Sequence, residues 1–403
     1  MRNILYIVPS DFDSLKKKGV VDMIKKQDEG GFFDKVITLY PFTRNNREIN
    51  LSDNNKIIEY GWKTGIDFLD KLFITKTLGT FRILFKLAFI FPFIIKKENI
   101  DIIRATDPYY MGLLGIYYSK IFKIPVVVSI HSDYDLGDKV GGQTFKIFGS
   151  RTLAKKLERF VYGNVDKILP ISEYLKKKII IEYKINSNKI EIFYHGISFE
   201  EFDKTKYINI KEKFNIKSKY IIGYVARLSK EKNCLDLLYI CKKLTEYRKN
   251  FVILVAGDGS EYIYMKEYIK KHNLEKYLML MGFQDKSIVY NIRKQSFVNL
   301  CLLDGFSLIE ACAGGRPVIA YDIEWHYELI KENETGFLIE KNNIDKVVEK
   351  IVYLMDNPDI ANKLGKNARK FVLERHNIKT VTKMKQKIYK EILSEKKKRK
   401  NMA

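Results

Sequence analysis

The amino-acid sequence predicts an α/β protein with two domains, each built on a parallel sheet. The chain has 403 residues, the length expected for two domains of ordinary size. Short runs of β-branched residues alternate with segments that carry apolar residues at helical spacing, which is the pattern of repeated βαβ units. A polar stretch without clear periodicity at residues 203–218 divides this alternation into two series. We therefore expect two Rossmann-like domains that face each other across a ligand cleft.

The first series predicts six strands, at residues 3–8, 35–39, 101–105, 125–130, 166–171 and 189–193. The clearest is PVVVSI at 125–130, because an unbroken β-branched run is typical of a parallel strand buried on both faces. A polar cluster beginning at His131 follows its carboxyl end. Ligands of α/β sheets bind at the carboxyl ends of strands, so His131 is either a substrate-binding residue or an ordinary loop histidine.

Residues 83–95 (ILFKLAFIFPFII) form the most hydrophobic segment of the chain. The segment is shorter than the roughly 20 residues that a membrane span needs, and it contains Lys86 and Pro92. We favour a core helix of the first domain. Because Lys and Arg flank the apolar residues, a patch that lies in a membrane interface is the alternative.

The second series predicts strands at residues 220–225, 251–256, 278–281, 298–303, 317–320 and 336–339, followed by a mostly helical region at 342–393. At its centre, LLDGFSLIEACAGGRPVIA (302–320) predicts a strand, a glycine turn, a short helix and another strand. The N-terminus of such a helix can bind a phosphate or a sugar hydroxyl. We expect Glu310 to be buried on this helix, where a ribose diol could be its partner. The alternative is a solvent-facing helical Glu.

The loop ARLSKEKN at residues 226–233 follows the first strand of the second series. Arg227 supplies a planar fork and Lys232 a point charge, and together they could hold two phosphates. A basic loop is more often simply solvated. The position of this one favours a site, because several candidates are expected at the carboxyl ends of strands in one sheet. These are Arg227, Lys232, Gly282, Gly305 and Glu310.

Composition restricts the partners. The formal net charge is +23, which favours anionic partners such as nucleotide phosphates or lipid head groups. No zinc knuckle or aromatic RNA-binding strand is recognisable, so nucleic acid is not expected. The four cysteines form no CxxC pair, and we expect small buried side chains, no disulfide and no metal site. The first residues, MRNILYIVPS, predict a strand and no signal peptide.

The order and spacing of these segments resemble the retaining GT-B glycosyltransferases of family four. The likeness appears in DIIRATDPYYMGLLG, VVVSIHSDYD, DKILPISEYL, GYVARLSKEKN, VAGDGSEY and FSLIEACAGGRPVIAYDI. It implies a GT-B architecture with an acceptor-side domain at residues 1–205 and a nucleotide-sugar-binding domain at 206–378. It further implies that a helix at 379–395 returns to the first domain, ahead of a basic tail at 396–403.

The resemblance also assigns roles to residues. Arg227 and Lys232 match the family's diphosphate-binding pair, and Glu310 matches the second Glu of its E-x7-E motif, which holds the ribose. His131 matches a first-domain histidine that points toward the transferred sugar. Donor-binding positions implied in the same way are Gly19, Gly282, Phe283, Gly305, Phe306 and Ser307.

The chain departs from the family pattern at one position of that motif. The residue eight before Glu310 is Leu302, so the first Glu of E-x7-E is missing. Asp304 is the nearest carboxylate, and it could take that place only with a two-residue gap.

The function implied is a retaining, metal-independent transfer of a sugar from a nucleotide-diphosphate sugar to a glycan or lipid-linked acceptor, in cell-surface polysaccharide synthesis. No cofactor is expected. The expected location is cytoplasmic, with peripheral binding at the anionic inner face of the membrane as an option. Two other readings stay open, a nucleotide-sugar epimerase of related fold and a non-catalytic nucleotide-sugar-binding protein.

Overall fold

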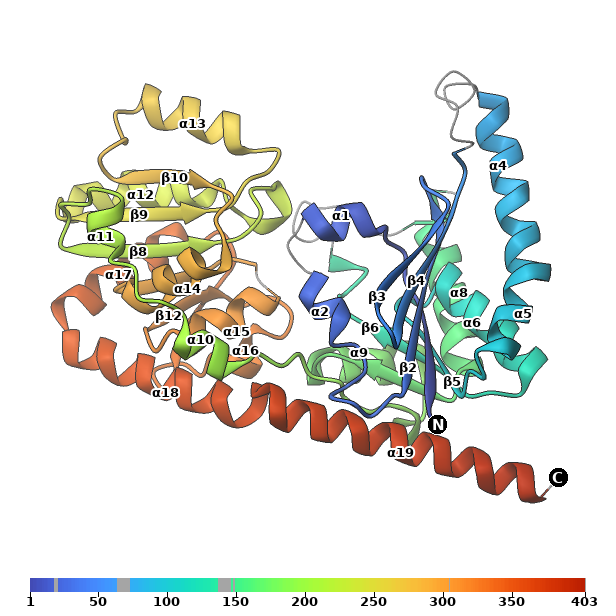
Figure 1. Cartoon of the computed structure of the whole chain (residues 1–403). Helices are drawn as coiled ribbons and strands as arrows, with labels where there is room; N and C mark the ends of the chain where they lie inside the picture. Colours follow the sequence, from blue (N-terminus) through green and yellow to red (C-terminus); the bar gives the residue numbers. More distant parts are fainter. Residues whose placement is uncertain (18–20, 64–72, 137–145, 148, 304, 403) are drawn as a thin grey trace. The chain divides into compact units, whose positions relative to one another are not determined.

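The structure is a computed structural model of the whole chain, and it describes all residues except 18–20, 64–72, 137–145, 148, 304 and 403. The chain folds into two compact units (Figure 1). The first comprises Met1–Ser132, Lys146–Tyr194 and Thr382–Ala403, and the second Asp133–Phe145 and His195–Val381. Each unit is an α/β layer structure around its own sheet, so the predicted fold class is confirmed.

The first unit contains a seven-stranded sheet in the order β3-β4-β2-β1-β5-β6-β7. Every neighbouring pair is parallel except β3 and β4, which form an antiparallel edge. The strands are β1 (Asn3–Ile7), β2 (Lys35–Thr43), β3 (Arg47–Ser52), β4 (Asn55–Gly61), β5 (Ile102–Ala105), β6 (Val126–Ile130) and β7 (Lys167–Pro170). The helices are α1 (Phe12–Lys17), α2 (Val21–Lys25), α4 (Phe73–Phe85), η1 (Lys86–Ile90), α5 (Phe91–Lys97), α6 (Tyr110–Phe122), α8 (Arg151–Asn164), α9 (Glu173–Tyr183) and η2 (Ser187–Lys189).

The second unit contains a six-stranded parallel sheet in the order β10-β9-β8-β11-β12-β13. The strands are β8 (Tyr220–Val225), β9 (Phe251–Ala256), β10 (Leu278–Gly282), β11 (Val298–Cys301), β12 (Val318–Tyr321) and β13 (Gly336–Ile339). The helices are α10 (Phe199–Lys204), α11 (Ile210–Lys213), η3 (Lys230–Lys232), α12 (Asp236–Tyr247), α13 (Tyr262–Lys271), α14 (Lys286–Gln295), α15 (Phe306–Ala313), α16 (His326–Leu329), α17 (Ile344–Asp356) and α18 (Pro358–His376).

The last helix, α19 (Ile378–Met402), packs on the first unit although it follows the second in sequence. Ile388, Tyr389 and Ile392 are buried in the core of the first unit together with residues of β1 and β5. A group of buried polar residues reinforces this contact. Arg104 of β5 donates to the Tyr389 hydroxyl at 3.1 Å and forms an ion pair with Glu29 at 3.4 Å. Such a buried network stabilises the contact only while every charge in it has a partner.

Three segments differ from the sequence prediction. Residues 189–193 are not a strand, because Ile190 forms only an isolated bridge with Ile168 and the preceding residues are a 3-10 turn. The polar stretch 203–218 includes the end of α10 and all of α11, whose Ile210 is fully buried. The antiparallel edge formed by β3 and β4 was not predicted.

The network around Glu29 yields a stability prediction. Glu29→Gln keeps the shape of the side chain but leaves Arg104 and Lys385, whose Nζ lies 3.6 Å from Glu29 Oε2, without their carboxylate. We expect the free energy of unfolding to fall by about 3 kcal/mol, as when one partner of a buried ion pair is removed. Denaturant unfolding measures this. Glu349→Gln, which removes an exposed carboxylate paired with Lys346, is the control and should leave the unfolding midpoint unchanged. Equal midpoints for the two variants would contradict the prediction.

Candidate active site

Arg227 and Lys232 lie in the loop between β8 and α12, at the carboxyl edge of the second sheet. Arg227 is largely exposed and forms an i,i+4 ion pair with Glu231. Lys232 is half-buried and ends the 3-10 turn η3, where its carbonyl accepts a hydrogen bond from the Tyr224 hydroxyl at 2.9 Å. Two cations therefore stand on one short loop at the edge where α/β sheets bind ligands.

Gly282 and Gly305 provide open backbone at the same edge. Gly282 ends β10 with φ +66°, a conformation that side chains other than glycine rarely adopt, and Gly305 is the N-cap of α15. A Cβ atom added at either glycine would have no neighbour within 4 Å. Phe283, directly after Gly282, is 67 % exposed. The backbone at both positions is thus accessible to a ligand, with an aromatic side chain beside one of them.

No described side chain caps the N-terminus of α15; the Leu308 amide donates to the Gly305 carbonyl at 3.2 Å, and the amides of Phe306 and Ser307 come before it in the first turn. Phe306 lies edge-on to the His195 ring, with centroids 6.0 Å apart. The Ser307 hydroxyl donates to the carbonyl of Val225 at 2.8 Å, which ties α15 to the end of β8. The positive end of the α15 dipole therefore stands beside the Arg227 loop and favours an anion there.

Glu310 differs from its prediction, because it is half-buried on α15 and not enclosed by apolar neighbours. The helix is only eight residues long, and the apolar side chains that face the core are Leu308, Ile309 and the alanines and cysteine beyond Glu310. Burial, and in addition the negative charge of Glu310, raises the pKa of Tyr290 to about 12. Glu310 is therefore a polar group at the margin of the core, close to Tyr290.

The glycine turn at residues 257–259 supports the Arg227 loop, a role that was not predicted from the sequence. Residues 257–259 (Gly-Asp-Gly) follow β9, and the Leu228 amide donates to the Asp258 carbonyl at 2.9 Å. A Cβ atom at Gly257 would lie 1.9 Å from the Ala226 carbonyl oxygen, and one at Gly259 would lie 2.2 Å from the Leu228 carbonyl oxygen. The signal was present in the sequence as a Gly-x-Gly turn directly after a buried strand.

His131 lies on the first unit, at the end of β6, whereas the other described candidates lie on the second. The side chain has surface open to solvent, and the protein atoms close to the ring remove part of its hydration. This partial desolvation, together with the charges of Arg104 and Lys385, lowers the pKa of His131 well below its usual 6.5. A neutral ring at pH 7 has one N–H donor and one acceptor nitrogen, which suits contact with a sugar hydroxyl.

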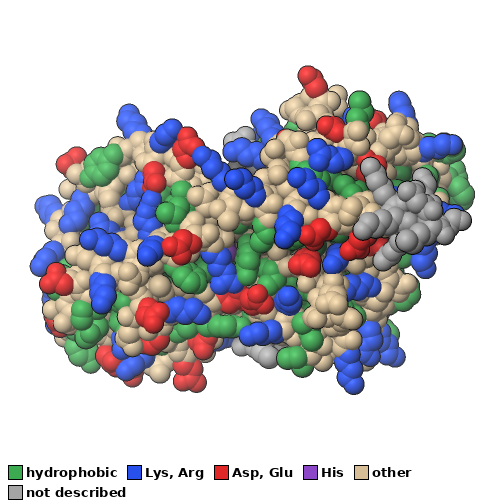
Figure 2. All heavy atoms as spheres, turned by 90° about the horizontal axis from the view of Figure 1, so that it is seen from below, with side chains coloured by type: hydrophobic (Ala, Val, Ile, Leu, Met, Phe, Trp, Pro, Cys, Tyr) green, Lys and Arg blue, Asp and Glu red, His purple; other side chains and the backbone are tan. Residues whose placement is uncertain are grey.

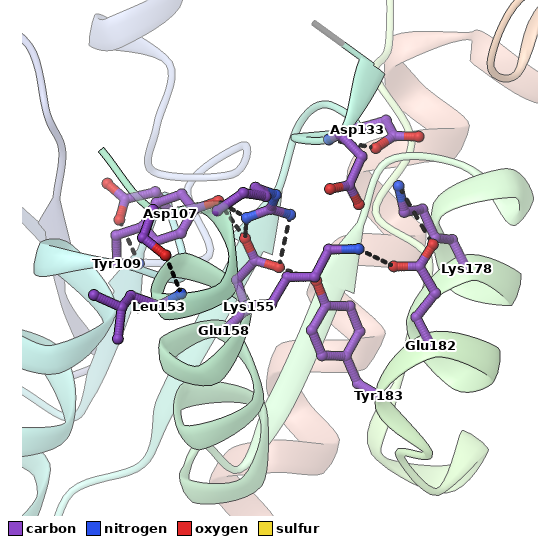
Figure 3. A network of polar contacts seen from close by, with 12 residues as sticks. Asp107, Tyr109, Asp133, Leu153, Lys155, Glu158, Lys178, Glu182 and Tyr183 are labelled. Atoms are coloured by element: carbon purple, nitrogen blue, oxygen red, sulfur yellow. Dashed lines mark hydrogen bonds and ion pairs between the residues drawn. The ribbon is translucent and has the colours of Figure 1, made fainter. Parts of the chain in front are cut away.

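A buried polar network lies at the carboxyl edge of the first sheet, where His131 also lies (Figure 3). Glu158 of α8 is almost fully buried and accepts hydrogen bonds from the Tyr109 and Tyr183 hydroxyls and from the Arg151 guanidinium. The Tyr109 amide donates to Asp107 at 2.7 Å. Burial raises the pKa of Asp107 to about 6, although the hydrogen bonds that it receives from backbone amides oppose this shift. The network fixes the starts of α6 and α8 beside the end of β5.

Two predicted donor-binding residues, Gly19 and Asp304, lie outside the described residues. Leu302, which takes the place of the first Glu of the motif, is fully buried, and its carbonyl accepts from the Asn233 side chain at 3.3 Å. All four cysteines are buried and unbridged. In the part of the chain that the structure describes, no group of three or more His, Cys, Asp or Glu side chains is placed to hold a metal ion.

Two family models match the chain. "Glycosyltransferase Family 4" matches residues 70–201, and "Glycosyl transferases group 1" matches residues 206–371. The chain is 24% identical over 290 residues to an alpha-monoglucosyldiacylglycerol synthase of Acholeplasma laidlawii, covering 68% of this chain and 71% of the relative. It is 28% identical over 309 residues to the UDP-Gal:alpha-D-GlcNAc-diphosphoundecaprenol alpha-1,3-galactosyltransferase of Escherichia coli, covering 72% and 76%.

Solved structures share the fold. A glycosyltransferase from Rickettsia africae ESF-5 superposes with a TM-score of 0.74 at 22% identity, over 97% of this chain and 98% of the other. Anabaena Alr3699/HepE in complex with UDP superposes with a TM-score of 0.72 at 14% identity, over 97% and 100%.

The close packing of residues 257–259 against the Arg227 loop yields a prediction. Gly259→Ala places a Cβ against the Leu228 carbonyl and should displace that loop, at a cost of about 1–3 kcal/mol in unfolding free energy. Any binding of a nucleoside diphosphate at this loop should weaken with it. The control is Gly163→Ala in α8, where a Cβ meets nothing within 4 Å and should stabilise by about 0.5–1 kcal/mol. Denaturant unfolding and calorimetric titration with UDP measure both effects. Unchanged stability and binding in Gly259→Ala would refute the supporting role.

Proposed function

Because the chain belongs to the GT-B glycosyltransferases that the two models describe, we propose that it is a retaining, metal-independent enzyme acting on a nucleotide-diphosphate sugar. The acceptor proposed is a glycan or a lipid-linked sugar of cell-surface polysaccharide synthesis. The proposal of a diphosphate donor rests on one observation. One edge of the second sheet brings together Arg227, Lys232 and the N-terminus of α15. These groups favour two adjacent negative charges.

The proposed reaction breaks the bond between the anomeric carbon and the diphosphate oxygen. The acceptor hydroxyl attacks from the same face, and its proton passes to the departing diphosphate, so no nucleophile of the protein is needed. Arg227 and Lys232 would stabilise the charge that develops on the leaving group, which is where preorganised donors contribute most to rate. The family resemblance gives the neutral His131 ring a hydrogen bond to a hydroxyl of the transferred sugar. Glu310 would hold the ribose.

Two related functions predict different products. An epimerase would convert the donor sugar, or release free nucleotide, without an acceptor. A non-catalytic binding protein would bind donor tightly and turn over no acceptor. Incubation with a UDP-sugar alone, and then with added lipid-linked acceptor, separates these outcomes. UDP-sugars are the donors to test first, since the Escherichia coli relative is named for UDP-Gal.

The acceptor side of the proposal rests partly on an apolar surface of the first unit. Residues Leu78–Lys97 form a helical segment of mean hydropathy 1.9 that could cross a membrane by length and composition alone. One stripe of this segment, Ile83, Leu87, Phe91 and Ile95, is buried against the sheet. The prediction of a core helix is therefore correct for the buried face of this segment and not for its exposed face. That buried stripe favours a helix that lies along the protein and not one that crosses a bilayer.

The opposite face of the segment is apolar and exposed. We call this surface the apolar ridge, and it consists of Leu78, Phe81, Leu84, Phe85, Phe89, Ile90 and Phe93. Phe81, Phe89 and Phe93 expose 66%, 61% and 75% of their surface. Phe81, Phe85, Phe89 and Phe93 each lie two residues from a member of the buried stripe, which is about 200° around an α-helix. Exposed apolar patches of this kind are typical of protein or membrane contacts.

The charges beside the ridge favour a membrane over a protein partner. Lys96 and Lys97 are exposed at its end, and Tyr117 and Ile121 of the neighbouring α6 extend the apolar surface with Lys120 beside them. An apolar face bordered by lysines is the pattern of helices that lie in an anionic interface. We therefore propose peripheral binding at the cytoplasmic face of the membrane, where a lipid-linked acceptor would be presented.

Basic side chains elsewhere form no single patch on the face seen in Figure 2. Lys and Arg are spread over it, with acidic side chains between them. A nucleic-acid groove instead carries a continuous basic stripe. The face seen in Figure 2 does not carry such a stripe.

The diphosphate assignment makes a direct prediction. Arg227→Ala and Lys232→Ala should each lower the turnover number by about 10²-fold or more, because each removes a charge that stabilises the leaving group. Lys230→Ala, which removes an exposed lysine from the same loop, is the matched control and should keep normal turnover. Sugar transfer to acceptor is the measurement, with and without EDTA, and EDTA should have no effect. Near-normal rates in both variants would remove the pair from the mechanism.

The apolar ridge makes a second prediction. The triple variant Phe81→Ser, Phe89→Ser, Phe93→Ser should no longer float with vesicles that contain phosphatidylglycerol, because it loses the apolar area that enters the interface. A control variant with Ile181, Tyr239 and Ile263 changed to Ser removes exposed apolar side chains from other surfaces and should float like the unaltered protein. Flotation of the ridge variant, or equal binding to neutral phosphatidylcholine vesicles by the unaltered protein, would contradict the proposal.

A further inference from the structure

Arg293 is the largest side chain in the described structure that is fully buried, and the proposed mechanism does not use it. It lies on α14 of the second unit. Its hydrogen bonds to other described residues go to carbonyl, hydroxyl and amide oxygens, and none goes to a described Asp or Glu. A buried guanidinium normally has a carboxylate partner, because desolvating an unpaired charge costs several kcal/mol.

Among the residues that the structure describes, the guanidinium contacts only neutral acceptors, and these lie on β8, α15 and β11. One terminal nitrogen donates to the Val225 carbonyl at 3.3 Å, at the end of β8, and to the Ser307 carbonyl at 3.3 Å, in the first turn of α15. The same nitrogen donates to the Ser307 hydroxyl. The other terminal nitrogen lies 3.4 Å from the side-chain oxygen of Asn299.

These bonds hold together the two segments that frame the proposed diphosphate site. Val225 stands two residues before Arg227, and Ser307 stands in the N-terminal turn of α15. Neutral dipoles solvate the guanidinium in part, but they leave its net charge uncancelled. Arg293 Nε is also buried without a hydrogen-bond partner. The positive charge therefore adds to that of the α15 N-terminus and acts in the same direction.

We propose that Arg293 is a positioning residue of the donor site, whose buried charge is balanced by the donor diphosphate when it binds. This inference rests on the proposed function, since it needs a diphosphate at the carboxyl edge of the second sheet. Arg293 would not touch the ligand. It would act by fixing the end of β8 against α15 and by raising the electrostatic potential at the site, in surroundings where low polarisability strengthens such an effect.

The test compares ligands that differ only in the diphosphate. The full-length protein is titrated with UDP, GDP and ADP and with the corresponding nucleosides. Arg293→Met should weaken the diphosphate by about tenfold or more, because the balancing charge is lost, and should leave nucleoside affinity within about twofold. Arg293→Lys keeps the charge and should retain most of the preference for the diphosphate. A purely structural role would weaken nucleoside and diphosphate equally, and that result would overturn the inference.

Two further measurements keep the outcome decisive. Ser307→Ala removes the hydroxyl that joins Arg293 to α15, and it is the variant to use if Arg293→Met does not fold. It should weaken UDP several-fold relative to uridine, and an unchanged ratio would refute the positioning role. If the unaltered protein binds none of the three nucleoside diphosphates, the proposed function itself fails. If it binds one, the variants decide the role of Arg293 alone.

Discussion

The geometry of the second unit's candidate site depends on where β8 ends. There the Val225 carbonyl accepts from the Ser307 hydroxyl at 2.8 Å, and the Ala226 amide donates to the Ala256 carbonyl at 3.3 Å. The first bond fixes α15 and the second fixes the glycine turn after β9. Because Arg227 follows immediately, its backbone position is determined by packing and by these bonds before any ligand binds. Such preorganisation is what electrostatic stabilisation of a leaving group requires.

Much of the fold could be predicted, because buried parallel strands leave a clear local signal. The run PVVVSI gave β6, and the six strands of the second sheet were all located to within about two residues, the usual uncertainty of element ends. The edge formed by β3 and β4 was missed, since no residue of β3 (Arg47–Ser52) is buried and the segment lacks the unbroken apolar run that marked the other strands. The strand predicted at residues 189–193 was wrong for the opposite reason, because the segment is partly buried but is not a strand. Their apolar residues are buried by packing beside β7, with too few ladder bonds to form a strand.

The candidate site was only partly predictable for a related reason. Arg227, Lys232 and the glycines lie in the segments that follow strands, so their common sheet edge could be inferred from strand order. Arg293 gave no such signal, because in the run IVYNIRKQ it is indistinguishable from a solvated arginine of a helix. Burial depends on which face of α14 meets the sheet, and one sequence does not determine that face. The apolar ridge was ambiguous for a similar reason, since its helix is apolar on both sides and hydropathy cannot separate the covered side from the exposed one.

The missing Glu of E-x7-E can be understood from the packing at Leu302. This residue is part of the second unit's core, and its carbonyl holds the Asn233 side chain, which follows Lys232 directly. A carboxylate at this position would be buried among apolar side chains and would carry a large desolvation penalty. The backbone carbonyl of Leu302 thus links the Lys232 loop to the end of β11 through its hydrogen bond with Asn233. Under the proposed function, contacts to the donor sugar's hydroxyls come from groups beyond this strand, and the first amides of α15 are described donors that follow it in the chain.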